Sequence, residues 1–278
     1  MPPDFVAVGH LTVDELSGGL RPGGSALYAG LFAHRQGLRV GLLTSYGPDF
    51  PFDVLPPGIE VVGVPAAVTT RFALDYRSEG RRLTLKERAA CIDPSHLPPH
   101  FREAGLAYLC PVADEVSPEL AGAFPDAAVG VGAQGWCRVW DRDGTVLMRP
   151  WPDPRPVLAR VQALFLSIDD AAGWEPRALD LYQDVPLGAL TFAEKGAILF
   201  VNGERHAVPA APAVEVEPTG AGDVFAAAFL IRYNLAGDPF EAASYAAVAG
   251  ALTVEAPGIS GVPTAERLAD RWRASQPR

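Results

Sequence analysis

The sequence has very few lysines and more acidic than basic residues. Of its 23 basic residues only Lys86 and Lys195 are lysines, and the 278-residue chain has a formal net charge of −10. Sequence-independent binding to nucleic acids and to anionic membranes depends on clustered Lys and Arg. We therefore expect neither nucleic acid nor membrane as a partner, and only local positive sites.

Cysteines and long apolar runs are also scarce. Cys91, Cys110 and Cys137 have no metal-ligand spacing and cannot all pair within the chain, which is typical of a reducing cytoplasm. The five histidines are scattered and form no zinc-like cluster. No apolar run reaches the roughly 18 residues of a membrane span, and the N-terminus lacks a secretory signal pattern. We expect a cytoplasmic protein.

Two common nucleotide-binding motifs are missing. There is no Gly-x-x-x-x-Gly-Lys-Ser/Thr sequence, which argues against a P-loop. After the apolar segment 5–8 the chain continues as Gly9-His10-Leu11-Thr12 instead of the Gly-x-Gly-x-x-Gly of dinucleotide-binding folds. Hydride transfer on a dinucleotide fold is therefore disfavoured.

The residues that are present predict a well-supplied hydrophobic core. Hydrophobic residues make up 49% of the chain and charged residues 20%, within the range of one α/β domain. Short apolar segments at 5–9, 39–45, 106–109, 127–131 and 164–167 read as buried strands separated by helical or irregular segments. Such alternation predicts a parallel sheet with helices on both faces and ligands beyond the carboxyl ends of the strands.

One stretch near the C-terminus carries chemistry that a scaffold does not need. Residues 214–217 alternate as a strand would, Pro218 stops the pairing, and a Gly-Ala-Gly turn leads into a helical pattern from Ala221. The first amides of a helix lack intrahelical partners and attract anions. Asp223 lies among them, either as an ordinary helix-start acid or as a base beside a bound phosphate.

The segment Thr219-Gly220-Ala221-Gly222-Asp223 resembles the C-terminal signature of the ribokinase/PfkB family of carbohydrate and nucleoside kinases. Glu217 stands where that family more often has Asp. The resemblance implies a ribokinase-like three-layer α/β fold, with a mostly parallel central sheet and a small β-hairpin or β-sheet lid. It also implies that the amides of Gly220, Ala221, Gly222 and Asp223 hold phosphoryl charge and that Asp223 deprotonates the acceptor hydroxyl.

The same resemblance suggests an acceptor site in the N-terminal half. Asp14 occupies the place of a substrate-binding Asp, and Gly23 and Gly24 resemble the family's Gly-Gly turn. Tyr28 departs from the family, which commonly has Asn there, so ribose or fructose specificity is not carried over. From the residues alone, we expect Gln134 and Arg138, which follow a predicted strand, to be polar groups of the acceptor pocket, although a simple connecting loop is the more frequent explanation of such a segment.

Donor-side residues are implied by weaker similarities. The family's Asn-x-x-Glu corresponds to Ser167 and Asp170, the latter near Mg²⁺ through water, and its Thr-x-Gly-x-x-Gly corresponds to Thr191, Ala193 and Gly196. Thr219 belongs to the same nucleotide side, and the region 247–253 would form an adenine wall. The implied cofactors are ATP and Mg²⁺, with a monovalent cation such as K⁺ left open.

Between residues 61 and 88 the pattern changes to alternating strands around Ser78-Glu79-Gly80, which predicts a hairpin. In the family an insertion here covers the sugar site and can be a dimer surface; a plain edge hairpin is the alternative. We therefore expect one kinase domain over 1–278 with a small lid insertion at about 61–88, as a monomer or homodimer.

These features predict an ATP-dependent kinase that phosphorylates a hydroxyl of a small sugar or polyol. Two alternatives stay open: a nucleoside kinase of the same family, and a catalytically weak nucleotide- or metabolite-binding protein on this fold. The departures at Tyr28, Ser167 and Ala193 favour the binding protein, and the presence of Asp223 opposes it.

Overall fold

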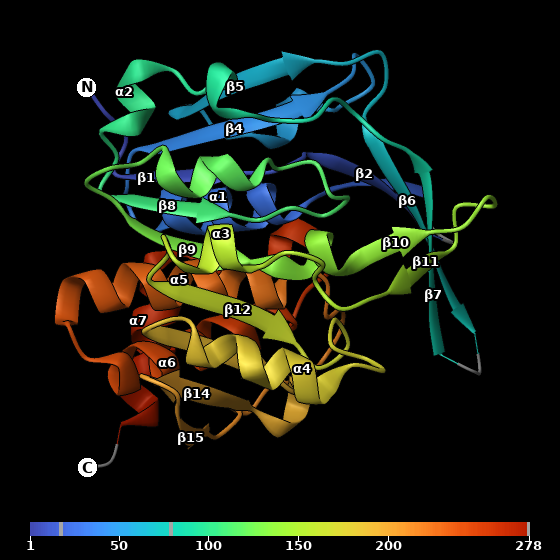
Figure 1. Cartoon of the computed structure of the whole chain (residues 1–278). Coiled ribbons are helices and arrows are strands. Elements are labelled where there is room, and N and C mark those ends of the chain that lie inside the picture. Colours follow the sequence, from blue (N-terminus) through green and yellow to red (C-terminus); the bar gives the residue numbers. More distant parts are fainter. Residues whose placement is uncertain (17–18, 78–79, 277–278) are drawn as a thin grey trace.

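The computed structural model describes residues 1–16, 19–77 and 80–276. Its centre is a nine-stranded sheet with the order β15-β14-β13-β12-β9-β8-β1-β4-β5 (Figure 1). The strands from β5 to β13 pair in parallel, and β14 and β15 complete the sheet as antiparallel strands. Their bounds are β1 (Phe5–Val8), β4 (Val40–Tyr46), β5 (Ile59–Pro65), β8 (Leu106–Leu109), β9 (Ala128–Gly132), β12 (Ala163–Ser167), β13 (Leu187–Thr191), β14 (Ala197–Val201) and β15 (Glu204–Val208).

Helices cover both faces of this sheet, which confirms the predicted α/β architecture (Figure 1). One hydrophobic cluster joins the sheet to α1 (Ser25–Arg35), α5 (Ala221–Ala236), α6 (Pro239–Thr253) and α7 (Ala265–Ser275). A second cluster on the other face includes α2 (Pro99–Arg102), α3 (Arg155–Leu158) and α4 (Glu175–Asp180). Because both faces are covered, strands such as β1 are apolar throughout instead of alternating.

A four-stranded sheet with the order β3-β2-β6-β7 extends beyond the main sheet (Figure 1). It consists of β2 (Thr12–Leu16), β3 (Gly19–Gly23), β6 (Thr70–Arg77) and β7 (Gly80–Glu87). The two strands β10 (Arg138–Trp140) and β11 (Val146–Met148) form a separate antiparallel pair. The expected hairpin is present as the antiparallel pair of β6 and β7, but residues 78 and 79 of its turn lie outside the described residues.

The strands that make up the small sheet are not the ones that the expected insertion at 61–88 would supply. Asp14, for which the sequence predicted no strand, lies in β2, which pairs in parallel with β6. The first residues of the expected insertion belong to β5 in the main sheet. Pairing between segments so far apart in the chain leaves no local pattern, so the sequence showed only the hairpin.

The predicted strand over 214–217 is wrong. These residues form no strand; Val214 and Val216 are 79% and 60% exposed, and the amides of Val216 and Glu217 both donate to the carbonyl of Val254. The alternation of Val and Glu had a strand-like period, but among the described residues this segment pairs with no strand. The segment is instead anchored to the end of α6.

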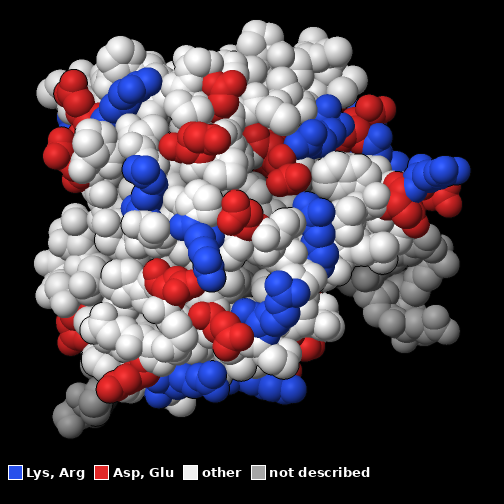
Figure 2. Space-filling model, viewed as in Figure 1, with Lys and Arg blue, Asp and Glu red and all other residues white. Residues whose placement is uncertain are grey.

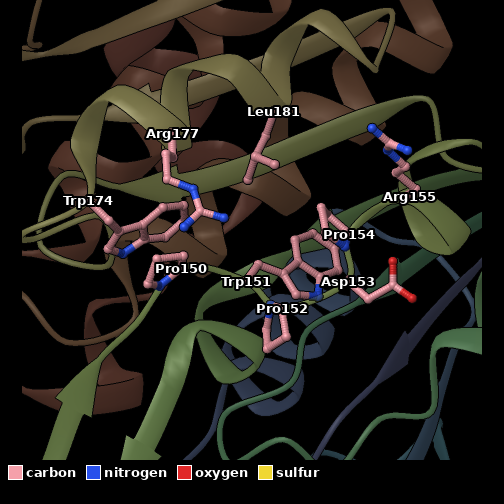
Figure 3. Close-up of a pocket in the computed structure, with 9 residues that line it drawn as sticks. All are labelled: Pro150, Trp151, Pro152, Asp153, Pro154, Arg155, Trp174, Arg177 and Leu181. Carbon is pink, nitrogen blue, oxygen red and sulfur yellow. The ribbon is translucent and has the colours of Figure 1, made fainter.

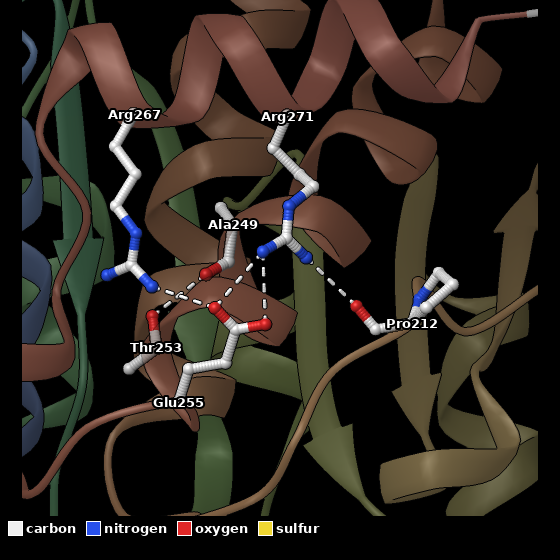
Figure 4. A network of polar contacts seen from close by, with 6 residues as sticks. All are labelled: Pro212, Ala249, Thr253, Glu255, Arg267 and Arg271. Carbon is white, nitrogen blue, oxygen red and sulfur yellow. Dashed lines mark hydrogen bonds and ion pairs between the residues drawn. The ribbon is translucent and has the colours of Figure 1, made fainter.

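Ion pairs hold the C-terminal helix against the end of α6. Glu255 accepts hydrogen bonds from Arg267 (2.7 Å) and Arg271 (3.1 Å), and Arg271 also donates to the carbonyl of Pro212 (Figure 4). This network connects α7 with the segment that leads to the glycine turn at 220–222.

Acidic and basic side chains are interspersed on the face shown in Figure 2, without a continuous basic area. Within the described part of the chain, no helix has both the length and the apolar character that crossing a bilayer would require.

Candidate active site

The glycine turn begins helix α5. Gly220 is its N-cap residue with φ +83°, a left-handed conformation that favours glycine. In the described residues, the amide of Ala221 donates to the carbonyl of Pro218 (3.3 Å), whereas the amides of Gly222 and Asp223 have no backbone carbonyl as acceptor. These two amides are available to an anion at the positive end of the helix dipole.

The ring of Tyr28 packs directly on this turn. A Cβ atom at Gly220 would lie 2.1 Å from Cδ1 of Tyr28, so no larger residue fits without displacing the ring. Tyr28 is 2% exposed and comes from α1. Burial raises its pKa well above the ordinary value, and the charges of Glu217, Asp14 and Asp223 add to this effect. The aromatic ring therefore supports the shape of the turn as well as lining the cavity.

An ion pair joins the small sheet to the segment before the turn. Arg21 of β3 donates to Glu217 at 2.5 Å, and the Glu217 side chain is only 13% exposed. The acid that precedes the glycine turn is thus held by a residue of the small sheet. Arg21 gave no sequence signal, because β3 was not predicted.

Asp223 lies in the first turn of α5 at the floor of a large cavity. Its surroundings remove most of its hydration, and this desolvation raises its pKa to about 7. A hydrogen bond from Ser25 and the charge of Arg138 lower the pKa, while the charge of Asp170 raises it. A carboxyl with a pKa near 7 can accept a proton at neutral pH and release it afterwards.

The cavity has a volume of about 1430 Å³, more than the 300–1,000 Å³ typical of a single small-molecule site. All but one of the residues predicted for the site line it: Asp14, Gly24, Tyr28, Gln134, Arg138, Ser167, Asp170, Thr191, Ala193, Gly196, Thr219, Gly220, Ala221, Gly222 and Asp223. The exception is Gly23. The fold thus brings together segments spread over more than two hundred positions of the chain.

Gly23 acts indirectly through Asp14 and Thr12. A Cβ at Gly23 would lie 2.4 Å from Oδ2 of Asp14 and 2.9 Å from Oγ1 of Thr12. Thr12 in turn donates to Oδ1 of Asp14 (3.1 Å). The missing side chain therefore leaves room for the carboxylate that faces the cavity. Gly24, with φ +101°, is the N-cap residue of α1.

Gln134 and Arg138 form one hydrogen-bonded unit. Gln134 lies in a 3₁₀ turn (Ala133–Cys137) after β9, and Arg138 begins β10. Arg138 donates to Oε1 of Gln134 (2.7 Å) and to the carbonyl of Val112 (2.9 Å), and its guanidinium lies 5.6 Å from the ring centre of Phe72. Both side chains reach the cavity and are also bound to each other.

Ser167 and Asp170 also bind each other. Ser167 donates to Oδ2 of Asp170 from its amide (3.0 Å) and its hydroxyl (2.7 Å). Both contacts end on the same carboxylate oxygen. Ser167 is the last residue of β12 and Asp170 follows this strand, so both lie at the carboxyl end of a parallel strand, where this class of sheet binds ligands.

Ala193, which replaces a family glycine, has φ +50°. It thus keeps a left-handed conformation in spite of its methyl group, at a cost of about 1–2 kcal/mol. The nearby Gly196 also has positive φ, +93°, and a Cβ there would lie 2.2 Å from the carbonyl oxygen of Val208.

One buried polar atom of the cavity lining has no protein partner. The hydroxyl of Thr219 is buried and makes no hydrogen bond among the described residues. Such an atom is costly unless something satisfies it. It adjoins the turn whose amides are available, which suits a ligand with acceptor oxygens such as a phosphate.

The described residues contain no group of three or more His, Cys, Asp or Glu that could hold a metal ion by itself. Two acids, Asp170 and Asp223, line the cavity near the glycine turn. This set suits Mg²⁺, which usually keeps several waters and is bound by one or two carboxylates together with substrate phosphates.

Several residues of the cavity were missed by sequence reasoning. They are Ser25 and Thr12, the apolar lining of the small sheet and the β10–β11 pair, and Lys195, one of the two lysines. The rarity of lysine was the one signal available. The apolar residues Phe72, Leu74, Leu83, Val146 and Met148 have no distinguishing pattern in the sequence.

A smaller hollow of about 340 Å³ (Figure 3) shares no lining residue with the cavity at the glycine turn. Its lining comes from the proline-rich connector 150–155 and from Trp174, Arg177 and Leu181. None of the predicted site residues lines it.

Part of the chain is similar in sequence to known kinases. Residues 181–265 match the model of the pfkB family carbohydrate kinases. The chain is 27% identical over 259 residues to a cytidine kinase of Thermococcus kodakarensis, with 86% of this chain and 91% of that protein covered.

Solved structures show the same fold. A pyrophosphate-dependent myo-inositol-1 kinase, altered toward myo-inositol-3 kinase, is similar with a TM-score of 0.81 and 20% identity over 98% of this chain and 99% of its own. Arabidopsis thaliana ribokinase complexed with ribose and ATP gives a TM-score of 0.72 and 18% identity over 98% and 99%. The chain therefore has a ribokinase-like fold, and the part of it that surrounds the glycine turn is similar to the pfkB family of carbohydrate kinases.

Proposed function

We propose that this kinase transfers the γ-phosphoryl group of ATP to a hydroxyl of a small sugar, polyol or nucleoside. The observation that carries the proposal is the position of Asp223. Asp223 lies at the start of α5, where the amides of Gly222 and Asp223 have no backbone carbonyl as acceptor among the described residues. It also lines a cavity large enough for two substrates. Polar groups from β2, α1 and the turn after β9 offer an acceptor site, and groups after β12 and β13 offer a donor site.

In the proposed reaction Asp223 accepts the proton of the acceptor hydroxyl. The hydroxyl oxygen forms a bond to the γ-phosphorus, the bond from that phosphorus to the bridging oxygen breaks, and ADP leaves. The amides of Gly222 and Asp223 stabilise the charge on the transferred group. Positioning and electrostatic stabilisation provide most of the acceleration in phosphoryl transfer.

Magnesium would bind between the phosphates of the donor and Asp170, with water between the carboxylate and the ion. When bound, it neutralises phosphate charge. The hydroxyl of Thr219 and the ammonium group of Lys195, which line the same cavity, are further candidates for donor contacts. A requirement for a monovalent cation such as K⁺ stays a prediction, tested by replacing K⁺ with a larger cation in the assay.

We propose ATP as the donor in preference to pyrophosphate. Residues with small or no side chains from two segments, one of which belongs to the predicted adenine wall, line the cavity: Ala210, Ala211, Ala213, Ala247, Gly250 and Ala251. A purine needs such space, and pyrophosphate does not. Since a structural relative uses pyrophosphate, both donors belong in the test.

The acceptor site combines a polar floor with an apolar lining. Asp14, Gln134 and Arg138 suit hydroxyls, while Phe72 and Leu74 suit a flat or apolar portion. A nucleoside has both features, and the cytidine kinase relative supports this choice. A sugar or polyol uses the polar floor alone.

The experiment is a thermal-shift screen of sugars, inositols and nucleosides with a nonhydrolysable ATP analogue, followed by Mg²⁺-dependent assays with ATP and with pyrophosphate. The proposal expects turnover with ATP for at least one acceptor class. Turnover with pyrophosphate alone would overturn the choice of donor.

A catalytically weak binding protein is the second candidate. The left-handed Ala193 and the ring of Tyr28 over the glycine turn both depart from the family pattern, and they favour this reading. Tight binding without turnover across the whole panel would support it.

A further inference from the structure

Two oppositely charged side chains meet beside the glycine turn. Arg21 of β3 donates to Glu217 at 2.5 Å, and neither residue belongs to the lining of the cavity. The Glu217 side chain is only 13% exposed, and within the described residues Arg21 is the basic residue paired with it. Because a charge that is nearly buried is costly unless it is paired, Arg21 compensates the charge of Glu217.

The backbone holds Glu217 in place without help from Arg21. The amides of Val216 and Glu217 both donate to the carbonyl of Val254 at the end of α6. Thr219, two positions further along the chain, already lines the cavity. Because this segment is anchored through its own backbone, the ion pair contributes charge compensation more than it contributes backbone position.

Acidic groups surround the aromatic ring that packs on this turn. Burial and the charges of Glu217, Asp14 and Asp223 raise the pKa of Tyr28, whereas the charge of Arg21 lowers it. A phosphate donor carries several negative charges, and at short range an uncompensated carboxylate repels such a group. Binding of the donor at this turn therefore requires that the charge of Glu217 be compensated.

We propose that Arg21 compensates the charge of Glu217 and thereby allows the glycine turn to bind the phosphates of the donor. The proposal rests on the proposed function, in which this turn binds phosphate. Arg21 acts through Glu217 and is therefore a positioning residue, not a contact of the donor. It lies opposite Asp14 in the pairing of β2 with β3, so the small sheet that carries an acceptor-side residue also influences the affinity for the donor.

Isothermal titration calorimetry tests this proposal without turnover. A nonhydrolysable ATP analogue with Mg²⁺ is titrated into the wild type and the variants, and methylenediphosphonate is titrated in parallel as a pyrophosphate analogue. Arg21→Gln leaves the charge of Glu217 uncompensated and is expected to raise the Kd of the donor analogue roughly 3–10-fold. Glu217→Gln leaves the charge of Arg21 uncompensated and is expected to lower this Kd roughly 2–5-fold.

The opposite signs separate a role in charge from a role in structure. Each single variant breaks the ion pair, so a purely structural role would weaken donor binding in both. The double variant removes both charges and is expected to bind the donor analogue within about twofold of the wild type. Arg232→Gln is the matched control, because Arg232 of α5 forms a comparable partly buried ion pair with Glu241 away from the cavity lining and is expected to leave the Kd unchanged.

An unchanged Kd in Arg21→Gln, unchanged or weaker binding in Glu217→Gln, or an equal loss in Arg232→Gln would each overturn the proposal. A double variant that binds as weakly as Arg21→Gln would also overturn it, because Arg21 would then contact the donor directly. If Arg21→Gln does not fold, the sign of the change in Glu217→Gln decides.

The outcome is separable from that of the proposed function. The expected changes in Kd without turnover for any acceptor would support the role of Arg21 and contradict the proposed function. Turnover with ATP but with Kd changes of the wrong sign would overturn the role of Arg21 alone. A wild type that binds neither analogue would overturn both.

Discussion

At the scale of single residues, Asp223 combines a chemical task with a cost in stability. Burial raises its pKa from 3.8 to about 7, so the folded state binds this proton more tightly than the unfolded state does. The resulting stabilisation is fully present at pH values below the pKa that Asp223 has in the unfolded state. It is lost as the pH rises through the pKa that Asp223 has in the folded state. Ionisation at neutral pH therefore weakens the fold while it creates the base.

We predict that Asp223→Asn is more stable than the wild type at pH 8. Because the Asp223 side chain is only half-buried, we expect a gain of about 1–3 kcal/mol in the free energy of unfolding, less than the full pKa difference would give. This gain is expected to shrink as the pH falls from 7 to 4.

Chemical denaturation of both proteins at pH 8 and pH 4.5 checks this prediction. Asp143→Asn, at an exposed turn, is the control and is expected to follow the wild type at both pH values. An equal stability difference between Asp223→Asn and the wild type at the two pH values would argue against a raised pKa.

Ala193 offers a second prediction at this scale. Its φ of +50° is strained for a residue with a Cβ, so Ala193→Gly is expected to raise the free energy of unfolding by about 0.5–1 kcal/mol. It should also lower the KM for the donor, because a methyl group leaves the cavity lining. Denaturation and steady-state kinetics measure the two effects separately; a loss of stability would show that Ala193 is not strained.

At the scale of elements, the turn before α5 depends on contacts that its own sequence does not reveal. The glycine motif and the start of a helix directly after it could be predicted from the local pattern alone. Its support by Tyr28 and by the ion pair of Arg21 with Glu217 could not, because these partners lie almost two hundred positions away. The wrong strand over 214–217 has the same origin: alternation is local, but a strand needs a neighbour.

The two glycines of this turn are expected to respond differently to substitution. Gly220→Ala places a Cβ at 2.1 Å from the Tyr28 ring with φ at +83°, so we expect a loss of about 2–4 kcal/mol from strain and overpacking. Gly222→Ala is the matched control, because a Cβ there meets no atom within 4 Å. Its stability is expected to stay near that of the wild type, while its affinity for the donor falls.

Denaturation curves of the two variants decide between these expectations. Equal losses of stability would mean that the close contact between Gly220 and Tyr28 does not matter. An unchanged donor affinity in Gly222→Ala would contradict the assignment of this turn to phosphate binding.

At the scale of the whole molecule, the cavity forms where the carboxyl ends of the parallel strands meet the small sheet. The order of short apolar strands was sufficient to predict the layers and the parallel sheet, since both follow from buried segments and their spacing. The small sheet was only partly predictable, because β2 and β6 pair across more than fifty residues. For the same reason the sequence placed candidates such as Asp14 and Gln134 near a site but gave no contact between Gln134, Ser25 and Arg138.

The central claim is that Asp223 is the base of a phosphoryl transfer, and Asp223→Asn tests it most directly. Turnover is measured for the wild type and the variant with Mg²⁺, ATP and an acceptor found in the screen, after thermal melting has shown that the variant is folded and binds the acceptor. The account predicts a fall in kcat of roughly 10²-fold or more, as expected for loss of a general base. Near-normal turnover in the folded variant would contradict it.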